Sequence, residues 1–76
     1  MNNQKRKELN KAIELLEQAQ SIVESVLEDE DFGFNNLTDG LQQTIRGQEM
    51  EAAIDNMNEA LDSIDEAIGA IEEATL

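Results

Sequence analysis

The chain has 76 residues, of which 18 are acidic and five are basic, and it contains neither Cys nor His, so its formal net charge is −13. A chain of this length forms one small domain, and we take residues 1–76 as that domain. Without Cys or His there is no disulfide, no soft-metal site and no common nucleophile–base pair. We therefore expect no enzyme activity and no cofactor.

The few basic residues are concentrated near the N-terminus. Lys5, Arg6, Lys7 and Lys11 come first, Arg46 follows alone, and no basic residue comes after it. Direct binding to nucleic acid or to an anionic membrane would require a positive surface, so we expect neither. The chain has no apolar run as long as a membrane-spanning helix and no signal-peptide core at its start, which predicts a soluble, cytoplasmic protein with a basic or apolar partner.

Residues 4–31 are predicted to form a first helix. Apolar residues recur there at heptad spacing, neither Pro nor Gly occurs before Gly33, and Asn2 or Asn3 can cap the start. Gln20 interrupts one of the apolar columns. The columns are Leu9, Leu16 and Val23; Ala12, Ala19 and Val26; and Ile13 and Leu27, with Leu15 and Ile22 widening the face.

Four consecutive acidic residues, 28–31, close this helix. They do not fit an EF-hand loop, because no register places the oxygen ligands and the glycine correctly together. Carboxylates are unfavourable at a helix C-terminus. We expect this end to fray, to pair with Arg46 or to meet a basic partner; a loose cation site is the alternative.

Phe32 and Phe34 flank Gly33 where the chain leaves the first helix. One interpretation is a plug that closes the end of a helical bundle. The other is an exposed anchor for a partner, with Arg46 beside it. A short helical turn is predicted to follow, with Asn36 as its cap.

Residues 48–73 are predicted to form a second helix, with Gly47 as its N-cap. Its apolar residues alternate steps of four and three without a break. Alanines at every seventh position, from Ala53 to Ala74, allow a neighbouring helix to approach closely. The predicted core and dimer contacts are Met50, Ile54, Met57, Ala60, Leu61, Ile64, Ala67, Ile68 and Ile71.

Two helices of matched length predict an all-α fold, an antiparallel helical hairpin. Each helix covers only one stripe of the other, whereas the apolar faces are three or four columns wide. We therefore expect two coiled-coil-like hairpins to pair into a homodimer, a dimeric four-helix bundle. The alternative is a monomer whose connector folds back over the uncovered stripe.

Acidic residues follow one outward face of the second helix. They supply roughly one charge per 5 Å, against about one per 1.7 Å along the axis of duplex DNA, so one helix is a partial nucleic-acid mimic and a dimer is a better one. A basic protein partner would suit this face; the alternative is a solvated face that keeps the protein soluble. These residues are Asp55, Glu59, Asp62, Glu66 and Glu73, with Asp65 and Glu72 on the flank.

Several stretches resemble a known group of proteins: "NNL" at 35–37, "LQQ" at 41–43, "RG" at 46–47 and "AIDNMNEALDSIDEAIGAIEE" at 53–73. They are similar to the small, acidic, two-helix proteins of unknown function encoded by tailed phages and prophages of Gram-positive bacteria. The resemblance implies a viral protein in the cytoplasm of an infected bacterium and carries no catalytic or binding residues. Because phages use small acidic proteins to block host or defence proteins, it also favours an inhibitor.

Together these features predict a non-enzymatic interaction protein that binds and inhibits a basic host protein, one that handles nucleic acid or serves in defence. The alternative is a structural or assembly element. In that role the broad apolar face, with Met50, Met57 and the alanine column, would join another helical protein.

Overall fold

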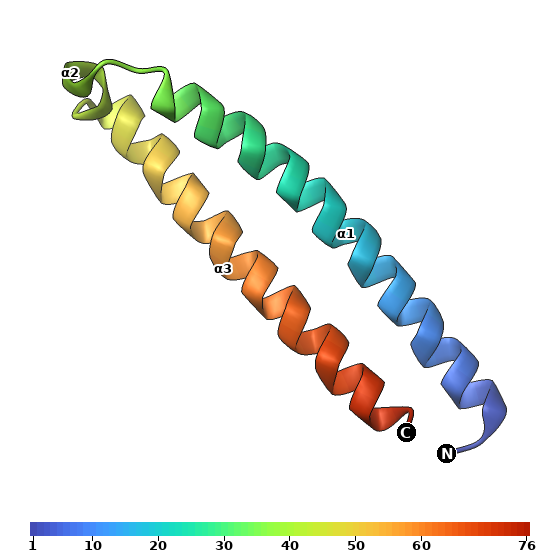
Figure 1. The fold of residues 1–76 in the computed structure, drawn as a ribbon. Helices are drawn as coiled ribbons and strands as arrows, with labels where there is room; N and C mark the ends of the chain where they lie inside the picture. The colour runs from blue at the N-terminus through green and yellow to red at the C-terminus, as the bar shows by residue number, and fades with distance from the viewer.

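The computed structural model describes all 76 residues, and helices are its only regular secondary structure. Helix α1 spans Asn3–Asn35, α2 spans Asp39–Gln42 and α3 spans Ile45–Ala74. Figure 1 shows α1 and α3 side by side and antiparallel, with α2 in the turn and both chain termini at the opposite end. The predicted helical hairpin, with a short helical turn in its connector, is confirmed.

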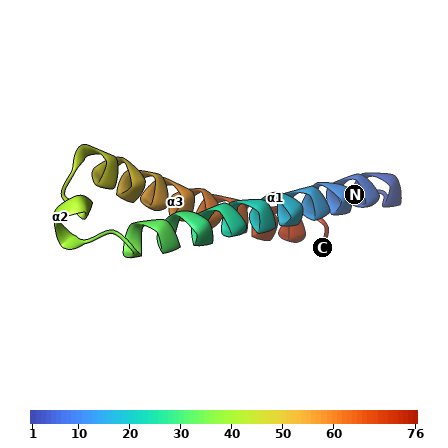
Figure 2. The ribbon, with the colours of Figure 1, turned by 90° about the horizontal axis from the view of Figure 1, so that it is seen from above.

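The molecule is a thin rod, 58 × 15 × 13 Å, with a radius of gyration of 17.2 Å. A compact chain of this length has a radius of gyration of about 11 Å. In Figure 2 the two long helices cross along the rod, as expected for helices packed like a coiled coil. A layer of two helices has no interior, and Gly47 is accordingly the only buried residue.

The inner faces of the two long helices are those that the heptad pattern predicts. On α3 the seam from Met50 to Ile71 is half-buried throughout, as are the alanines at 53, 60 and 67, whereas Ala74 is exposed. Gln20 lies on the inner face of α1 and donates a hydrogen bond from Nε2 to Oδ1 of Asp65, at 3.3 Å. The interruption in the apolar column is thus a polar contact between the helices.

Helix α1 begins as predicted but ends later. Asn2 is its N-cap and accepts the Lys5 N–H at 2.8 Å. The helix then continues through the acidic cluster to Asn35, so the expected fraying at 28–31 is wrong. Asn36 is the C-cap of this longer helix: its backbone N–H and its side-chain amide both donate to the Phe32 carbonyl, at 3.1 and 2.8 Å, and so hold the last turn closed.

Two threonines set the remaining helix starts. Thr44, and not Gly47, caps α3: its hydroxyl accepts the Gly47 N–H at 3.2 Å and donates to the Leu41 carbonyl. Thr38, and not Asn36, caps α2 by accepting the Leu41 N–H at 3.3 Å. A threonine oxygen supplies the acceptor that glycine lacks, which explains why α3 starts earlier than predicted.

Candidate interaction surfaces

The seven acidic residues predicted as a partner-binding stripe on α3 are all exposed. Five of them lie in two neighbouring heptad columns on the side of α3 opposite its seam: Asp55 and Asp62 in one, Glu59, Glu66 and Glu73 in the other. We call these five residues the acidic stripe. Asp65 and Glu72 lie closer to α1, and Asp65 there accepts the hydrogen bond from Gln20.

The charge of the acidic stripe is not neutralised within the chain. The only salt bridge joins Lys11 and Glu14 of α1, at 3.9 Å, and both side chains are exposed. The expected pair between Arg46 and the 28–31 cluster does not form. Because α1 stays helical through the cluster, successive carboxylates point to different sides of the helix. Nowhere do three acidic residues gather in a way that could hold a metal ion.

Phe32 and Phe34 do not act together. Both belong to α1, and two residues that are two positions apart on a helix point in different directions. Phe32 is 73% exposed, so it reaches outward and does not plug the bundle. Phe34 is half-buried, and its carbonyl accepts a hydrogen bond from Gln42.

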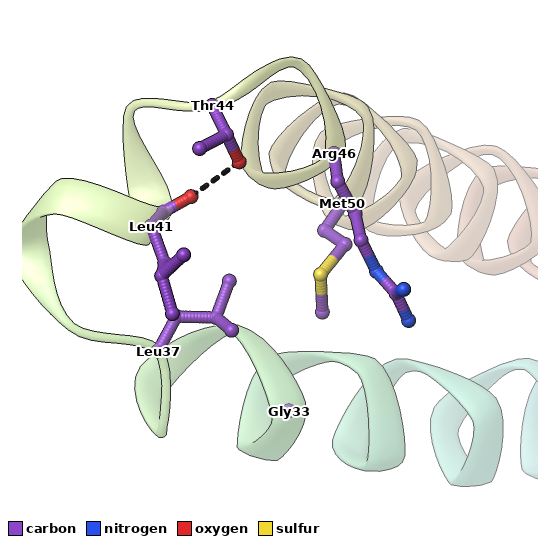
Figure 3. A pocket seen from close by; sticks show the side chains of 6 residues that line it. All are labelled: Gly33, Leu37, Leu41, Thr44, Arg46 and Met50. Carbon is purple, nitrogen blue, oxygen red and sulfur yellow. Dashed lines mark hydrogen bonds between the residues drawn. The ribbon is translucent and has the colours of Figure 1, made fainter.

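A small open hollow of about 390 Å³ lies where α2 separates the ends of the two long helices. Figure 3 shows Arg46 and Met50 on α3 directed toward the α1 side, facing Leu37 and Leu41 across the hollow. Arg46 is exposed. The hollow is mainly apolar, and Arg46 is its one charged residue. It is lined by Gly33, Leu37, Leu41, Thr44, Arg46 and Met50.

Three residues that hold this scaffold together were missed by sequence reasoning. Gln42 donates from Nε2 to the carbonyls of Phe34, at 3.1 Å, and Leu37, at 3.4 Å. Arg6 donates from Nε to the Thr75 carbonyl at 3.2 Å and so places a cation at the C-terminal end of α3. Gly47 lets the first turn of α3 approach the backbone of α2. Of these three residues, only Gly47 stood out in the sequence, and it was interpreted there as the N-cap of the second helix.

The two long sides of the hairpin differ in chemistry. The bond between Gln20 and Asp65 marks one side of the helix interface. The heptad columns of α1 and α3 that border this side are mostly acidic, and we call this side of the hairpin the acidic side. The opposite side, the apolar face, carries large side chains on α1 and small ones on α3. The acidic side comprises Asn10, Glu17, Glu24 and Asp31 with Glu51, Asn58, Asp65 and Glu72. The apolar face comprises Ala12, Leu15, Ala19, Ile22 and Val26 with Ala53, Ala60, Ser63, Ala67 and Ala70, and the same columns carry two polar residues toward the connector, Asp29 and Asn56.

None of the three helices contains a stretch with the length and the apolar character that a membrane span requires. Comparison of the chain with protein-family profiles, curated proteins and solved structures finds no match. The resemblance to phage proteins therefore stays a prediction, and the function has to be argued from the surfaces alone.

Proposed function

We propose that this chain is a non-enzymatic interaction protein, a dimeric acidic hairpin that binds and inhibits a basic, nucleic-acid-handling or defence protein of a phage-infected bacterium. The observation that supports this function is the acidic stripe, whose carboxylates are exposed and have no cation beside them. A regular row of uncompensated charge on a rigid helix suits a groove that normally holds a nucleic-acid backbone. Phe32, which is 73% exposed, and Arg46 would add contacts at the connector end.

The test neutralises four of the five carboxylates of the acidic stripe. One variant combines four substitutions, Asp55→Asn, Glu59→Gln, Asp62→Asn and Glu66→Gln. The original chain and the variant are each used to capture partners from the producing bacterium, and the captured proteins are identified by mass spectrometry. We expect a basic protein to be captured by the original chain and lost by the variant. Capture should also weaken steeply with added salt, because exposed charges are screened.

A control with the same charge change separates the stripe from net charge. It combines Glu14→Gln, Glu17→Gln, Glu24→Gln and Glu28→Gln, all on exposed positions of α1. This variant should still capture the basic protein. Equal loss in both variants would mean that only the total charge matters, and equal retention would mean that the partner does not use the acidic stripe.

A second candidate function is that of an assembly element that joins a helical partner through the apolar face. The exposed side chains of Leu15, Ile22 and Val26 favour it, since large apolar groups on a surface mark association sites. Ala60→Leu with Ala67→Leu would then abolish capture by filling the space for the partner helix. Neutralising the acidic stripe would leave capture unchanged.

A further inference from the structure

The apolar face exposes large side chains, and the rod-shaped chain as a whole exposes more surface than a compact domain of this size. Leu15, Ile22 and Val26 are 52%, 65% and 51% exposed. The chain exposes 5627 Å², whereas a folded monomer of 8.5 kDa exposes about 4,650 Å². The excess over the whole rod, roughly 1,000 Å², is large enough to include the ~800 Å² that each partner contributes to a protein–protein interface of standard size.

We propose that a second copy of this chain covers the apolar face, related by a two-fold axis parallel to the rod, so that α1 of each copy packs antiparallel against α3 of the other. This inference gives the dimer of the proposed function a specific interface. The large side chains of α1 and the small ones of α3 lie on the same face. Each copy therefore places Leu15, Ile22 and Val26 over the alanine column of its partner.

The register of this dimer follows from contacts within one chain. A two-fold axis parallel to the rod leaves every residue at its own height along the rod. Gln20 lies level with Asp65, and a side chain at Gly33 would touch Met50. Because the helices are antiparallel, each step toward the N-terminus of α1 corresponds to one step toward the C-terminus of α3. Counting from these two contacts, Lys11 lies level with residues 72–74 of α3, and Phe32 lies level with residues 51–53.

The residues that meet at the rim of this interface are complementary in chemistry. On the outer border of the apolar face, one heptad column of α1 faces one heptad column of the partner's α3. Four pairs of residues from these two columns lie at the same height along the rod. One pair joins a cation and a carboxylate, two pairs join a polar group and a carboxylate, and one pair joins two apolar side chains. The pairs are Lys11 with the partner's Glu73, Gln18 with the partner's Glu66, Ser25 with the partner's Glu59, and Phe32 with the partner's Ala52.

The other two-fold arrangement is opposed by charge. An axis perpendicular to the rod would place α3 against the partner's α3. The heptad column that holds Glu59, Glu66 and Glu73 would then lie beside the same acidic column of the other copy, which is destabilising. The charge pattern thus selects the axis parallel to the rod. The bond between Lys11 and Glu14 does not prevent the rim contact, because exposed pairs of this kind contribute little.

Sedimentation equilibrium of the full chain at micromolar concentration tests the proposal. We expect a mass twice the 8.5 kDa of one chain. Lys11→Glu and Glu73→Lys should each raise the dimer dissociation constant about tenfold, because each change breaks two symmetry-related pairs. Combining Lys11→Glu with Glu73→Lys should restore the original constant, since the pair is reversed and the net charge is unchanged.

Glu72→Lys is the matched control for Glu73→Lys. It has the same charge change on the same helical turn, but Glu72 lies on the acidic side, so dimerisation should not weaken. A mass of one chain for the original protein, equal effects of Glu72→Lys and Glu73→Lys, or no recovery in the reversed pair would each overturn the proposal. Because the mass is measured without any other protein, failure here is distinct from failure of the acidic stripe to bind a basic partner.

Discussion

Gly47→Ala is predicted to destabilise the hairpin although it replaces a glycine inside a helix. In an open helical position this replacement stabilises by about 1 kcal/mol, because alanine loses less backbone entropy on folding. At Gly47 an added Cβ would lie 2.7 Å from the carbonyl oxygen of Leu41 and closer still to that of Gln42. These are backbone atoms, so α2 or the start of α3 has to move.

The magnitude follows from these two opposing effects. Overpacking of this kind costs about 1–3 kcal/mol and sometimes more, which exceeds the helix-propensity gain of about 1 kcal/mol. We expect a net loss of up to about 2 kcal/mol in the free energy of unfolding, measured by urea denaturation with far-ultraviolet circular dichroism. All variants are compared at one protein concentration, because association contributes to apparent stability.

Gly69→Ala is the control on the same helix. An added Cβ there meets nothing within 4 Å, so this variant should gain about 1 kcal/mol. The two replacements are chemically identical and should differ in sign. If Gly47→Ala were as stabilising as Gly69→Ala, the close approach between α3 and α2 would not constrain the connector.

Two further predictions concern the other residues that hold the hairpin together. Gln42→Leu removes two hydrogen bonds to carbonyls of the α1 terminus and should cost about 1–2 kcal/mol in thermal unfolding, whereas Gln43→Leu, at an exposed neighbour with no side-chain hydrogen bond, should change little. Arg6→Gln removes the cation near Thr75 and should cost up to about 1 kcal/mol at low salt and less at high salt. Lys7→Gln, which has the same charge change at an exposed position, should have a smaller effect, and equal losses would argue against a specific role for Arg6.

The sequence alone predicted those features of the fold that depend on the heptad repeat. Heptad spacing identified the inner face of α3 along its whole length, because one residue every three or four positions must face the partner helix. It also placed the acidic residues of α3 on the outward side. These features depend on periodicity within one helix and require no knowledge of what lies opposite.

The connector was predicted less well because its contacts join different elements. Gly47 looked like an N-cap, but the close approach of Gln42 and the hydroxyl of Thr44 give it another role. Likewise, four carboxylates at a helix end suggested fraying, whereas the side-chain amides of Asn36 and Gln42 add hydrogen bonds to the carbonyls of Phe32 and Phe34 in the last turn of α1. The Asn36 and Thr44 bonds are local caps within three or four residues, whereas the Gln42 bond depends on where α2 lies relative to α1, which no local pattern specifies.

Both chain ends lie together at one end of a rod whose longest dimension is 58 Å, and the connector lies at the other (Figure 1). A tag or a fused protein at either terminus will therefore leave Phe32 and the connector free, but it will crowd the basic residues of the N-terminal turns and the last acidic residues of α3. An immobilised chain will accordingly present its connector end outward. Attachment at an engineered site in α2 will instead expose the terminal end, so the two formats report on opposite ends of the same molecule.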